Sequence, residues 1–313
     1  TGNIIVKKES APMIRQDYTA WASPVAAQQL QSFSPNTLPN RFYEYLYTGT
    51  TTLTAYQAVS AATNFITGKG YIIRAADDSS ASVPAVHSGQ FTGVPFNGNL
   101  TMTLGKGYNL LGNPYASPID ADRFLLDNTS TVDALYFWTH TVPASGGVYP
   151  VNNFATYTTL GGAASAAGGA IPNGTIQTGQ GFYVKALEFG TANFSNLQRV
   201  NAATSTQFFR TNTTPDVEVE KHRIWLNLND ANNSYNQLLL GYMNGATNDF
   251  DNQIDGKVLD DSKPILFNII AAEKYIIQGR SLPFTDADIV PLGLKVLTAG
   301  TYTISMENFD GLF

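Results

Sequence analysis

The chain has 313 residues, which is more than one hydrophobic core usually serves, so we expect at least two domains. Charged residues make up only 13% and the net charge is −6, which argues against a nucleic-acid partner because few basic groups are present to neutralise phosphates. Cysteine is absent and no apolar run reaches the about 20 residues of a membrane span, which excludes disulfides, thiolate metal sites and a spanning helix.

Strand patterns dominate the chain, and short helices are expected at only a few places. Residues 25–31 and 55–62 are two candidates, and the best one follows Asp120, which would cap a helix over residues 121–126. Before it, residues 100–104 alternate leucine or methionine with threonine, which is the period of a pleated strand with one buried face. Turns rich in Gly, Pro, Asn and Asp separate such strands, as antiparallel hairpins require.

Three segments near the N-terminus are echoed in the same order further along the chain. The pairs are 18–25 with 111–119, 41–45 with 134–138, and 68–75 with 179–186. We interpret residues 1–201 as a duplicated β-rich region, with repeat one at about 1–104 and repeat two at about 105–201. The alternative is chance similarity, since aromatic strands that follow Gly turns resemble one another.

The last third of the chain has a separate strand series. Residues 202–218 are polar and lack apolar periodicity, so they are predicted to be a linker. Residues 219–313 are predicted to form a β-sandwich domain that continues beyond the fragment. Its expected strands are 223–228, 237–243, 264–270, 274–278, 290–297 and 300–307. The fold class expected for the whole chain is therefore all-β, with tandem antiparallel β-sandwich domains of jelly-roll or Ig-like type and few short helices.

Catalytic motifs are missing from the sequence. His87, His140 and His222 have no partner at metal-ligand spacing, and we interpret them as surface or strand-edge residues. No Gly-x-Ser-x-Gly elbow occurs, and the Gly-x-Gly pairs at 68–70, 105–107 and 179–181 precede strands, which indicates tight turns and not a phosphate loop. We therefore expect no enzyme and no catalytic residue. The alternative is a glycosidase that uses two carboxylates from among Glu44, Asp120, Glu273, Asp286 and Asp288.

An acidic loop at 248–256 is the best candidate for a metal site. Asp249, Asp251, Gln253 and Asp255 offer alternating oxygen ligands before a Gly turn, which is what Ca²⁺ requires. Counted from Asp251, position twelve is Ser262 where an EF-hand has Glu, and no helical pattern flanks the loop. Calcium would stiffen the loop, and it is the one cofactor that the sequence suggests. The alternative is an Asx-rich turn that binds nothing.

The chain is rich in aromatic residues, which make up 12% of it. Trp21, Tyr45 and Trp138 are the predicted ligand-binding residues, because exposed aromatic rings beside Asn and Asp stack on sugars or hold a protein surface. They belong to a larger group with Tyr43, Tyr47, Tyr149 and Tyr157. Core packing is the alternative for any single member.

Several motifs are shared with a known class of proteins. They are Gly-Tyr-Asn-Leu-Leu-Gly-Asn-Pro-Tyr at 107–115, Leu-Tyr-Phe-Trp at 135–138, Gly-Gln-Gly-Phe at 179–182, Arg-Ile-Trp-Leu-Asn-Leu at 223–228, and Ile-Gln-Gly-Arg at 277–280 with Pro-Phe at 283–284. With these motifs spread over nearly the whole chain, it resembles large secreted cell-surface and gliding-associated adhesins of the Bacteroidetes, which the type IX secretion system exports.

The resemblance implies an extracellular location at the bacterial cell surface, export by the type IX secretion machinery, and a position upstream of a C-terminal sorting domain. The chain starts with Thr1 and stops at Phe313 just after a strand-like stretch, so we expect an excised or processed piece. The expected function is a non-enzymatic structural or adhesive segment of a secreted cell-surface protein. Its partners would be a glycan or protein ligand on another surface, or other parts of its own larger chain. The alternative is a carbohydrate-binding accessory module of a secreted polysaccharide-degrading enzyme.

Overall fold

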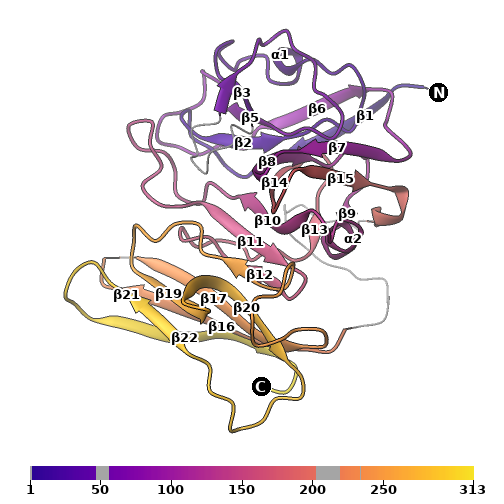
Figure 1. Ribbon diagram of the computed structural model, residues 1–313. Helices are drawn as coiled ribbons and strands as arrows, with labels where there is room; N and C mark the ends of the chain where they lie inside the picture. The colour runs from indigo at the N-terminus through magenta and orange to yellow at the C-terminus, as the bar shows by residue number, and fades with distance from the viewer. Residues whose placement is uncertain (1, 47–55, 202–218, 233) are drawn as a thin grey trace.

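The computed structural model describes residues 2–46, 56–201, 219–232 and 234–313, so the predicted linker at 202–218 and Tyr47 lie outside the described residues. The described part is all-β, with only two short α-helices among its strands (Figure 1). Strand pairing there is antiparallel, except where β17 (Tyr235–Met243) runs parallel to β20 (Glu273–Ser281). The predicted all-β fold class is confirmed.

The first unit comprises the described residues from 2 to 93. Its four-stranded sheet has the order β2 (Tyr18–Trp21), β5 (Tyr71–Arg74), β3 (Phe42–Tyr45) and β4 (Tyr56–Ala58), and β1 (Ile4–Glu9) pairs separately with β6 (Ser88–Gly93). The helix predicted at 25–31 overlaps only the start of α1 (Leu30–Phe33). The helix predicted at 55–62 is wrong in its described part, because β4 pairs there with β3 and tertiary pairing overrides the local pattern.

The second unit comprises residues 94–201. Its five-stranded sheet has the order β8 (Gly107–Gly112), β14 (Gly181–Ala186), β10 (Val132–Trp138), β11 (Phe154–Thr158) and β12 (Gly161–Ala163). Two smaller sheets pair β7 (Leu100–Leu104) with β15 (Gly190–Phe194) and β9 (Ile119–Asp120) with β13 (Thr175–Ile176), and a 3-10 turn, η1 (Asn196–Gln198), follows β15. The predicted helix is confirmed as α2 (Ala121–Asp127), because the Asp120 side chain accepts a hydrogen bond from the backbone N–H of Arg123.

The two units share a strand order. In the first unit the sheet runs β2, β5, β3, β4, and in the second it runs β8, β14, β10, β11 before β12 is added. A short helix follows the first strand of each sheet in the chain, and a two-stranded sheet accompanies each. Two copies of one ancestral unit would produce this arrangement. Strand β7, which the sequence placed at the end of repeat one, pairs with β15 of the second unit.

The C-terminal sheet is a single hydrogen-bonded sheet of seven strands. Its order is β21 (Leu292–Lys295), β19 (Ile265–Ile270), β20, β17, β16 (Lys221–Asp230) and β22 (Tyr302–Asp310), and β18 (Gly256–Lys257) pairs with β20. All six predicted strands are present, whereas β18 was not predicted because two residues carry no alternating pattern. The strands belong to one sheet, although the sequence predicted a sandwich of two.

Both faces of the sheets in the two units are covered. Trp21 and Phe42 of the first unit lie in one core cluster with Phe91, while Leu135 of the second unit lies in another. The opposite faces meet in a third cluster, where Tyr45 packs with residues of the second unit such as Tyr136. Because successive strand residues point to opposite faces, a strand between two covered faces buries side chains on both sides.

The contact between the two units is closely symmetric. The backbone N–H of Ala22 donates to the carbonyl oxygen of Gly179 at 2.9 Å, and that of Gly112 donates to Gly68 at 2.9 Å. A Cβ on Gly112 would stand 2.1 Å from the Cβ of Ala22, so only glycine allows the two strands to approach this closely. The Gly-x-Gly segments at 68–70 and 179–181 thus join the two units, in addition to leading into β5 and β14.

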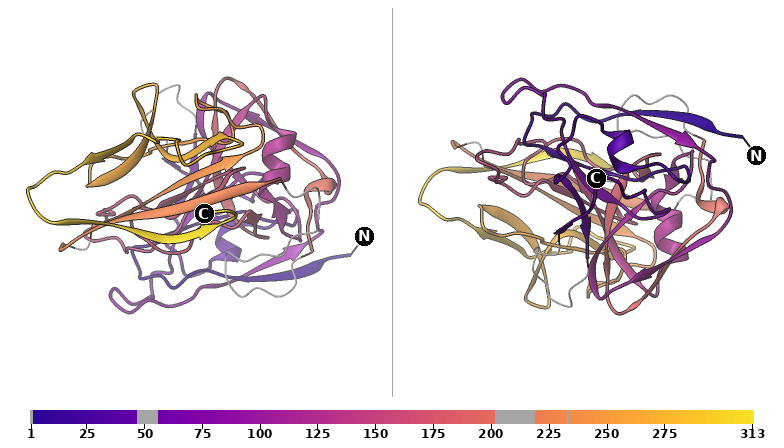
Figure 2. Two further views of the ribbon diagram at one scale, coloured as in Figure 1. Left: turned by 90° about the horizontal axis from the view of Figure 1, so that it is seen from below. Right: turned by 90° about the horizontal axis from the view of Figure 1, so that it is seen from above.

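The second unit also packs against the C-terminal sheet, and this second contact is called the junction below (Figure 2). The indole N–H of Trp225 donates to the carbonyl oxygen of Gly162 at 2.8 Å, and Arg223 Nη1 donates to the carbonyl oxygen of Leu160 at 3.0 Å. The two ends of the chain lie at opposite ends of the molecule, with the first unit at one and the C-terminal sheet at the other (Figure 1).

Candidate functional site

The three aromatic residues predicted to bind a ligand do not form a surface platform. Trp21 is 1% exposed and packs edge-on against Phe33 at a ring distance of 5.0 Å, and Tyr45 is 9% exposed. Trp138 is half-buried, and its indole N–H donates to the backbone carbonyl of Tyr18 at 2.7 Å. Trp21 and Tyr45 are thus core residues, because both faces of their sheet are covered, and they cannot stack on a sugar in this fold.

The loop predicted to bind calcium lies at the junction. The carboxylate of Asp251 accepts from the backbone N–H of Thr247 at 2.5 Å, and Asp255 accepts from the N–H groups of Asp251 at 2.7 Å and Gly279 at 2.8 Å. Asp249 is exposed. Within the described ranges, no three acidic or histidine side chains converge as a group that could hold a metal ion. The hydrogen bonds that Asp251 and Asp255 accept from nearby backbone N–H groups are typical of an Asx-rich turn.

Gln253 has a structural role in the same loop. Its side-chain N–H₂ donates to the carbonyl oxygens of Leu125 at 2.6 Å and Val132 at 3.0 Å, both in the second unit. The backbone of Gln253 adopts a φ of 66°, in the left-handed region, and its own carbonyl accepts from the N–H of Thr159 at 2.7 Å. Gln253 therefore attaches the loop to the second unit.

Asp255 is the most strongly perturbed carboxyl group in this region. It is 0% exposed, and this desolvation raises its pKa to about 7, against the opposing effect of the two backbone N–H groups that it accepts from. The negative charges of Asp251 and Asp133 raise the pKa further. Burial thus makes ionisation of Asp255 less favourable in the fold than in water.

Two of the three histidines are not at the predicted surface positions, while the third, His87, is half-buried. His140 and His222 are buried, and desolvation lowers the pKa of His140. His222 lies between two partners: its Nε2 is 3.0 Å from a carboxylate oxygen of Glu220, and its Nδ1 accepts from the backbone N–H of Leu312 at 3.1 Å. These contacts attach the end of β22 to β16.

The carboxylates considered for a glycosidase are mostly engaged elsewhere. Glu44 forms an ion pair with Lys69, Asp120 caps α2, and Glu273 pairs with Lys257 at 3.3 Å. Asp288 pairs with Arg280 at 2.7 Å, while Asp286 is exposed. Ion pairs and caps account for four of these five residues as structural groups.

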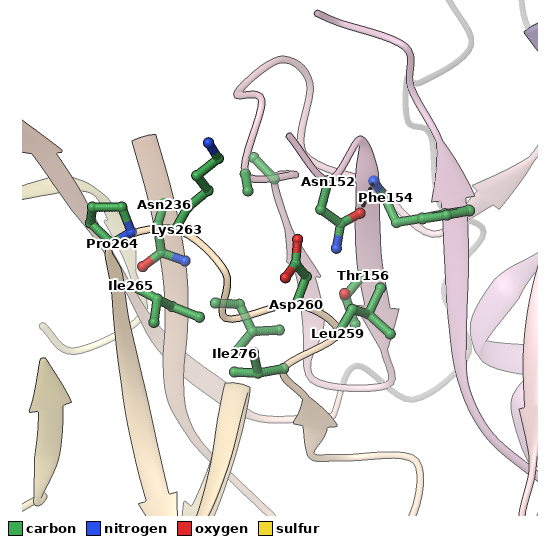
Figure 3. A pocket seen from close by; sticks show the side chains of 13 residues that line it. Asn152, Phe154, Thr156, Asn236, Leu259, Asp260, Lys263, Pro264, Ile265 and Ile276 are labelled. Carbon is green, nitrogen blue, oxygen red and sulfur yellow. Dashed lines mark hydrogen bonds between the residues drawn. The ribbon is translucent and has the colours of Figure 1, made fainter. Parts of the chain in front are cut away.

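A cleft at the junction is the best candidate for a binding site (Figure 3). One wall is β11 of the second unit, and the other is formed by the ends of β17 and β19 with the segment that precedes β19. The polar side chains that line it are Asn152, Thr156, Asn236, Asp260 and Lys263, and the apolar ones include Phe154, Leu259, Ile265 and Ile276. The cavity volume is about 40 Å³, which is room for about three water molecules.

Two polar groups that line this cleft have no hydrogen-bond partner among the described residues. Thr156 and Asn236 are each 4% exposed and come from opposite walls. Asn236 Oδ1 accepts from the backbone N–H of Leu266 at 2.7 Å, which leaves its N–H₂ group with no acceptor among the residues that the structure describes. The Thr156 hydroxyl has no partner in the same part of the chain. Both groups line the cleft, so they are available to hydrogen-bond with water or with a ligand that enters it.

The mouth of the cleft carries one charge of each sign. The carboxylate of Asp260 accepts from the backbone N–H of Ser262 at 2.8 Å and from its hydroxyl at 3.1 Å, which holds it in place. The ammonium group of Lys263 has no ion-pair partner among the described residues. Asn152 Oδ1 accepts from the N–H of Phe154 at 2.9 Å, so its N–H₂ remains a donor at the rim. The charged side chains that line the cleft, Asp260 and Lys263, carry opposite charges, so the lining has no net charge.

Comparison with known protein families identifies the family of the chain. A family model described as a domain of unknown function (DUF8693) matches residues 1–313. The chain belongs to the DUF8693 family. Neither a curated protein nor a solved structure is similar enough to this DUF8693 chain to count as a match. In the described part of the chain, no helix is long and apolar enough to cross a membrane.

The cleft of this DUF8693 chain was missed by sequence reasoning. Thr156 and Asn236 lie in different strands and different parts of the fold, and no motif connects them. Both read as the polar member of an alternating strand, which ordinarily faces solvent. Only the packing of the second unit against the C-terminal sheet brings them together.

Proposed function

We propose that the chain is a non-enzymatic structural and adhesive segment of a secreted bacterial cell-surface protein. The observation that supports this is the way in which buried hydrogen bonds join the first unit, the second unit and the C-terminal sheet. Ala22 with Gly179, and Gln253 with Leu125, are examples from the two contacts. A stiff body of this kind holds a binding surface away from its anchor, and most ionisable groups considered for chemistry serve its packing.

The proposal predicts a loss of attachment when the region is removed. Residues 1–313 are deleted from the full-length surface protein, and attachment of cells to polysaccharide-coated and uncoated surfaces is counted, with surface display measured by antibody. We expect attachment to fall severalfold at equal display. Unchanged attachment at equal display would contradict the adhesive role. Hydrolysis of a polysaccharide or peptide by the purified chain, abolished by one Asp or Glu substitution, would contradict the non-enzymatic one.

The resemblance to Bacteroidetes adhesins supports an extracellular location and export by the type IX system. Surface display of the full-length protein is then expected to be lost in a strain that lacks this secretion machinery. Display at normal levels in that strain would show another export route.

A second candidate function is a carbohydrate-binding accessory module of a secreted polysaccharide-degrading enzyme. The junction cleft favours it, because Thr156, Asn236 and Asp260 present hydrogen-bonding groups without catalytic partners. The two candidates differ in what the region is attached to. Fusing the chain to an unrelated polysaccharide hydrolase and measuring turnover on insoluble substrate distinguishes them, since an accessory module increases that turnover and an adhesive segment does not.

A further inference from the structure

We infer that the junction cleft binds the hydroxyl-bearing end of a neutral glycan, with one substituent of the sugar in its enclosed part. The inference rests on the proposed adhesive function and goes further, because it names the class of ligand and the residues that bind it.

The hydrogen-bonding groups of the cleft match a sugar. The Thr156 hydroxyl both donates and accepts, and the N–H₂ groups of Asn236 and Asn152 donate, while the Asp260 carboxylate accepts. A sugar hydroxyl is likewise donor and acceptor, so adjacent hydroxyls satisfy a mixed set of this kind. A ligand hydroxyl at Thr156 or Asn236 would replace a hydrogen bond to water, and each such exchange contributes about 0.5–1.5 kcal/mol.

The charges at the mouth decide between neutral and charged ligands. Asp260 and Lys263 contribute one negative and one positive charge, so the cleft has no net charge from its own lining. An anionic sugar would be attracted by Lys263 and repelled by Asp260. A cationic sugar would be attracted by Asp260 and repelled by Lys263. A neutral sugar hydrogen-bonds to both groups without repulsion.

The shape of the cleft limits how much of the ligand enters. A volume of about 40 Å³ is too small for a sugar ring but suits a hydroxymethyl or acetyl substituent. Its apolar lining, which includes Leu259, Ile265 and Ile276, contacts the carbon–hydrogen groups of such a substituent. The ring therefore stays at the mouth, near Asp260 and Asn152, which are both labelled in Figure 3.

The test is binding of defined sugars to the purified full chain by isothermal titration and ligand-observed NMR. The probes are neutral oligosaccharides of glucose, mannose, galactose and N-acetylglucosamine, with uronate-containing and sulfated oligosaccharides as charged counterparts. We expect at least one neutral series to bind more tightly than every charged one. Binding of charged sugars alone, or of none in either set, would overturn the inference.

Three variants locate the site. Thr156→Val removes the hydroxyl at constant shape and is expected to weaken binding about tenfold, whereas Thr156→Ser, which restores a hydroxyl, keeps most of the affinity. Lys263→Ala tests the mouth and is expected to weaken binding about threefold. The matched control is Thr103→Val, an exposed threonine on β7 far from the cleft in the chain.

The Thr156→Val variant should fold like the wild type, so a loss of sugar binding can be assigned to the cleft. Because the Thr156 hydroxyl has no protein partner in the described part of the chain, valine leaves no buried group unpaired, and the melting temperature should not fall. Sugar binding that Thr156→Val and Lys263→Ala leave unchanged would place the ligand elsewhere and overturn the inference. Attachment that is lost on deletion of residues 1–313 but kept by both variants would overturn the cleft alone, leaving the adhesive function intact.

Discussion

The first and second units meet through close backbone packing, whereas the second unit and the C-terminal sheet meet at the junction through long polar side chains. Between the units, strands approach so closely that Gly112 and Ala22 leave no room for a larger side chain. At the junction, long polar side chains such as Gln253 and Arg223 reach across to backbone carbonyl oxygens. A larger side chain should therefore destabilise the contact between the units, and the loss of a side-chain hydrogen-bond donor should destabilise the junction. The junction also leaves space between its walls, which is where the cleft lies.

The largest expected difference is a pH effect confined to the junction. The pKa of Asp255 is raised from its ordinary value of 3.8 to about 7, so the folded state holds the proton more tightly than the unfolded state. The stabilisation is fully present below about pH 4 and is lost as the pH rises to about 7, by up to about 4 kcal/mol at 1.36 kcal/mol per pH unit.

Urea unfolding of the wild type and Asp255→Asn from pH 4 to pH 8 measures this effect. The variant should lose less free energy of unfolding than the wild type as the pH rises over that range. Parallel pH profiles for the two proteins would show that Asp255 ionises as freely in the fold as in the unfolded chain.

A smaller loss is expected from one methyl group at the contact between the units. Gly112→Ala places a Cβ against that of Ala22 and should lower the free energy of unfolding by about 3 kcal/mol, the upper end of overpacking costs. The double variant Gly112→Ala with Ala22→Gly exchanges the two residues and should recover most of the loss. Gly2→Ala, where nothing lies within 4 Å, is the control. No recovery in the double variant would count against the close approach.

The junction should respond to a lost donor by about 2 kcal/mol. Gln253→Ala leaves the carbonyl oxygens of Leu125 and Val132 without their side-chain donor. Calorimetry should then resolve separate melting of the C-terminal sheet before the two units, since only the junction is weakened. Asn248→Ala, at an exposed position of the same loop, should leave one transition. A single lowered transition in Gln253→Ala would mean that the three parts unfold together.

The smallest expected effect concerns calcium. A site occupied at a hundred times its Kd would stabilise the fold by about 2.7 kcal/mol and raise the melting temperature by several degrees. Because the Asp251 and Asp255 carboxylates already accept backbone N–H groups, we expect a chelator to change the melting temperature by less than about 1 °C. A larger drop, restored by added Ca²⁺, would revive the calcium loop.

Local patterns predicted helix α2 and the strands of the C-terminal sheet apart from β18, but they were wrong about the described part of the helix expected at 55–62. Alternation identified strands such as β16 and β22, and Asp120 identified the start of α2, because period and capping depend on residues a few positions apart. Burial was harder to predict. The sequence pattern of β2 suggested a strand with one exposed face, and Trp21 was expected on that face. In the fold both faces of the sheet are covered, and the second face is covered by residues of another unit.

The candidate site could not be predicted for the same reason. Asn236 and Thr156 line one cleft although they belong to two separate sheets, which meet only at the junction. Gln253 was predicted to be a metal ligand through its side-chain oxygen. In the fold its side-chain N–H₂ group instead donates to a backbone carbonyl oxygen of the second unit. Composition identifies a polar loop but not the direction in which each amide points.

The opposite placement of the chain ends gives the two contacts a mechanical meaning (Figure 1). A pull between the ends is transmitted through the contact of the two units and then through the junction, so both bear the same tension in series. The weaker of the two sets the rupture force of the whole segment. A sugar that binds to both walls of the cleft would add contacts across the junction. Its binding would then raise the force needed to separate the second unit from the C-terminal sheet.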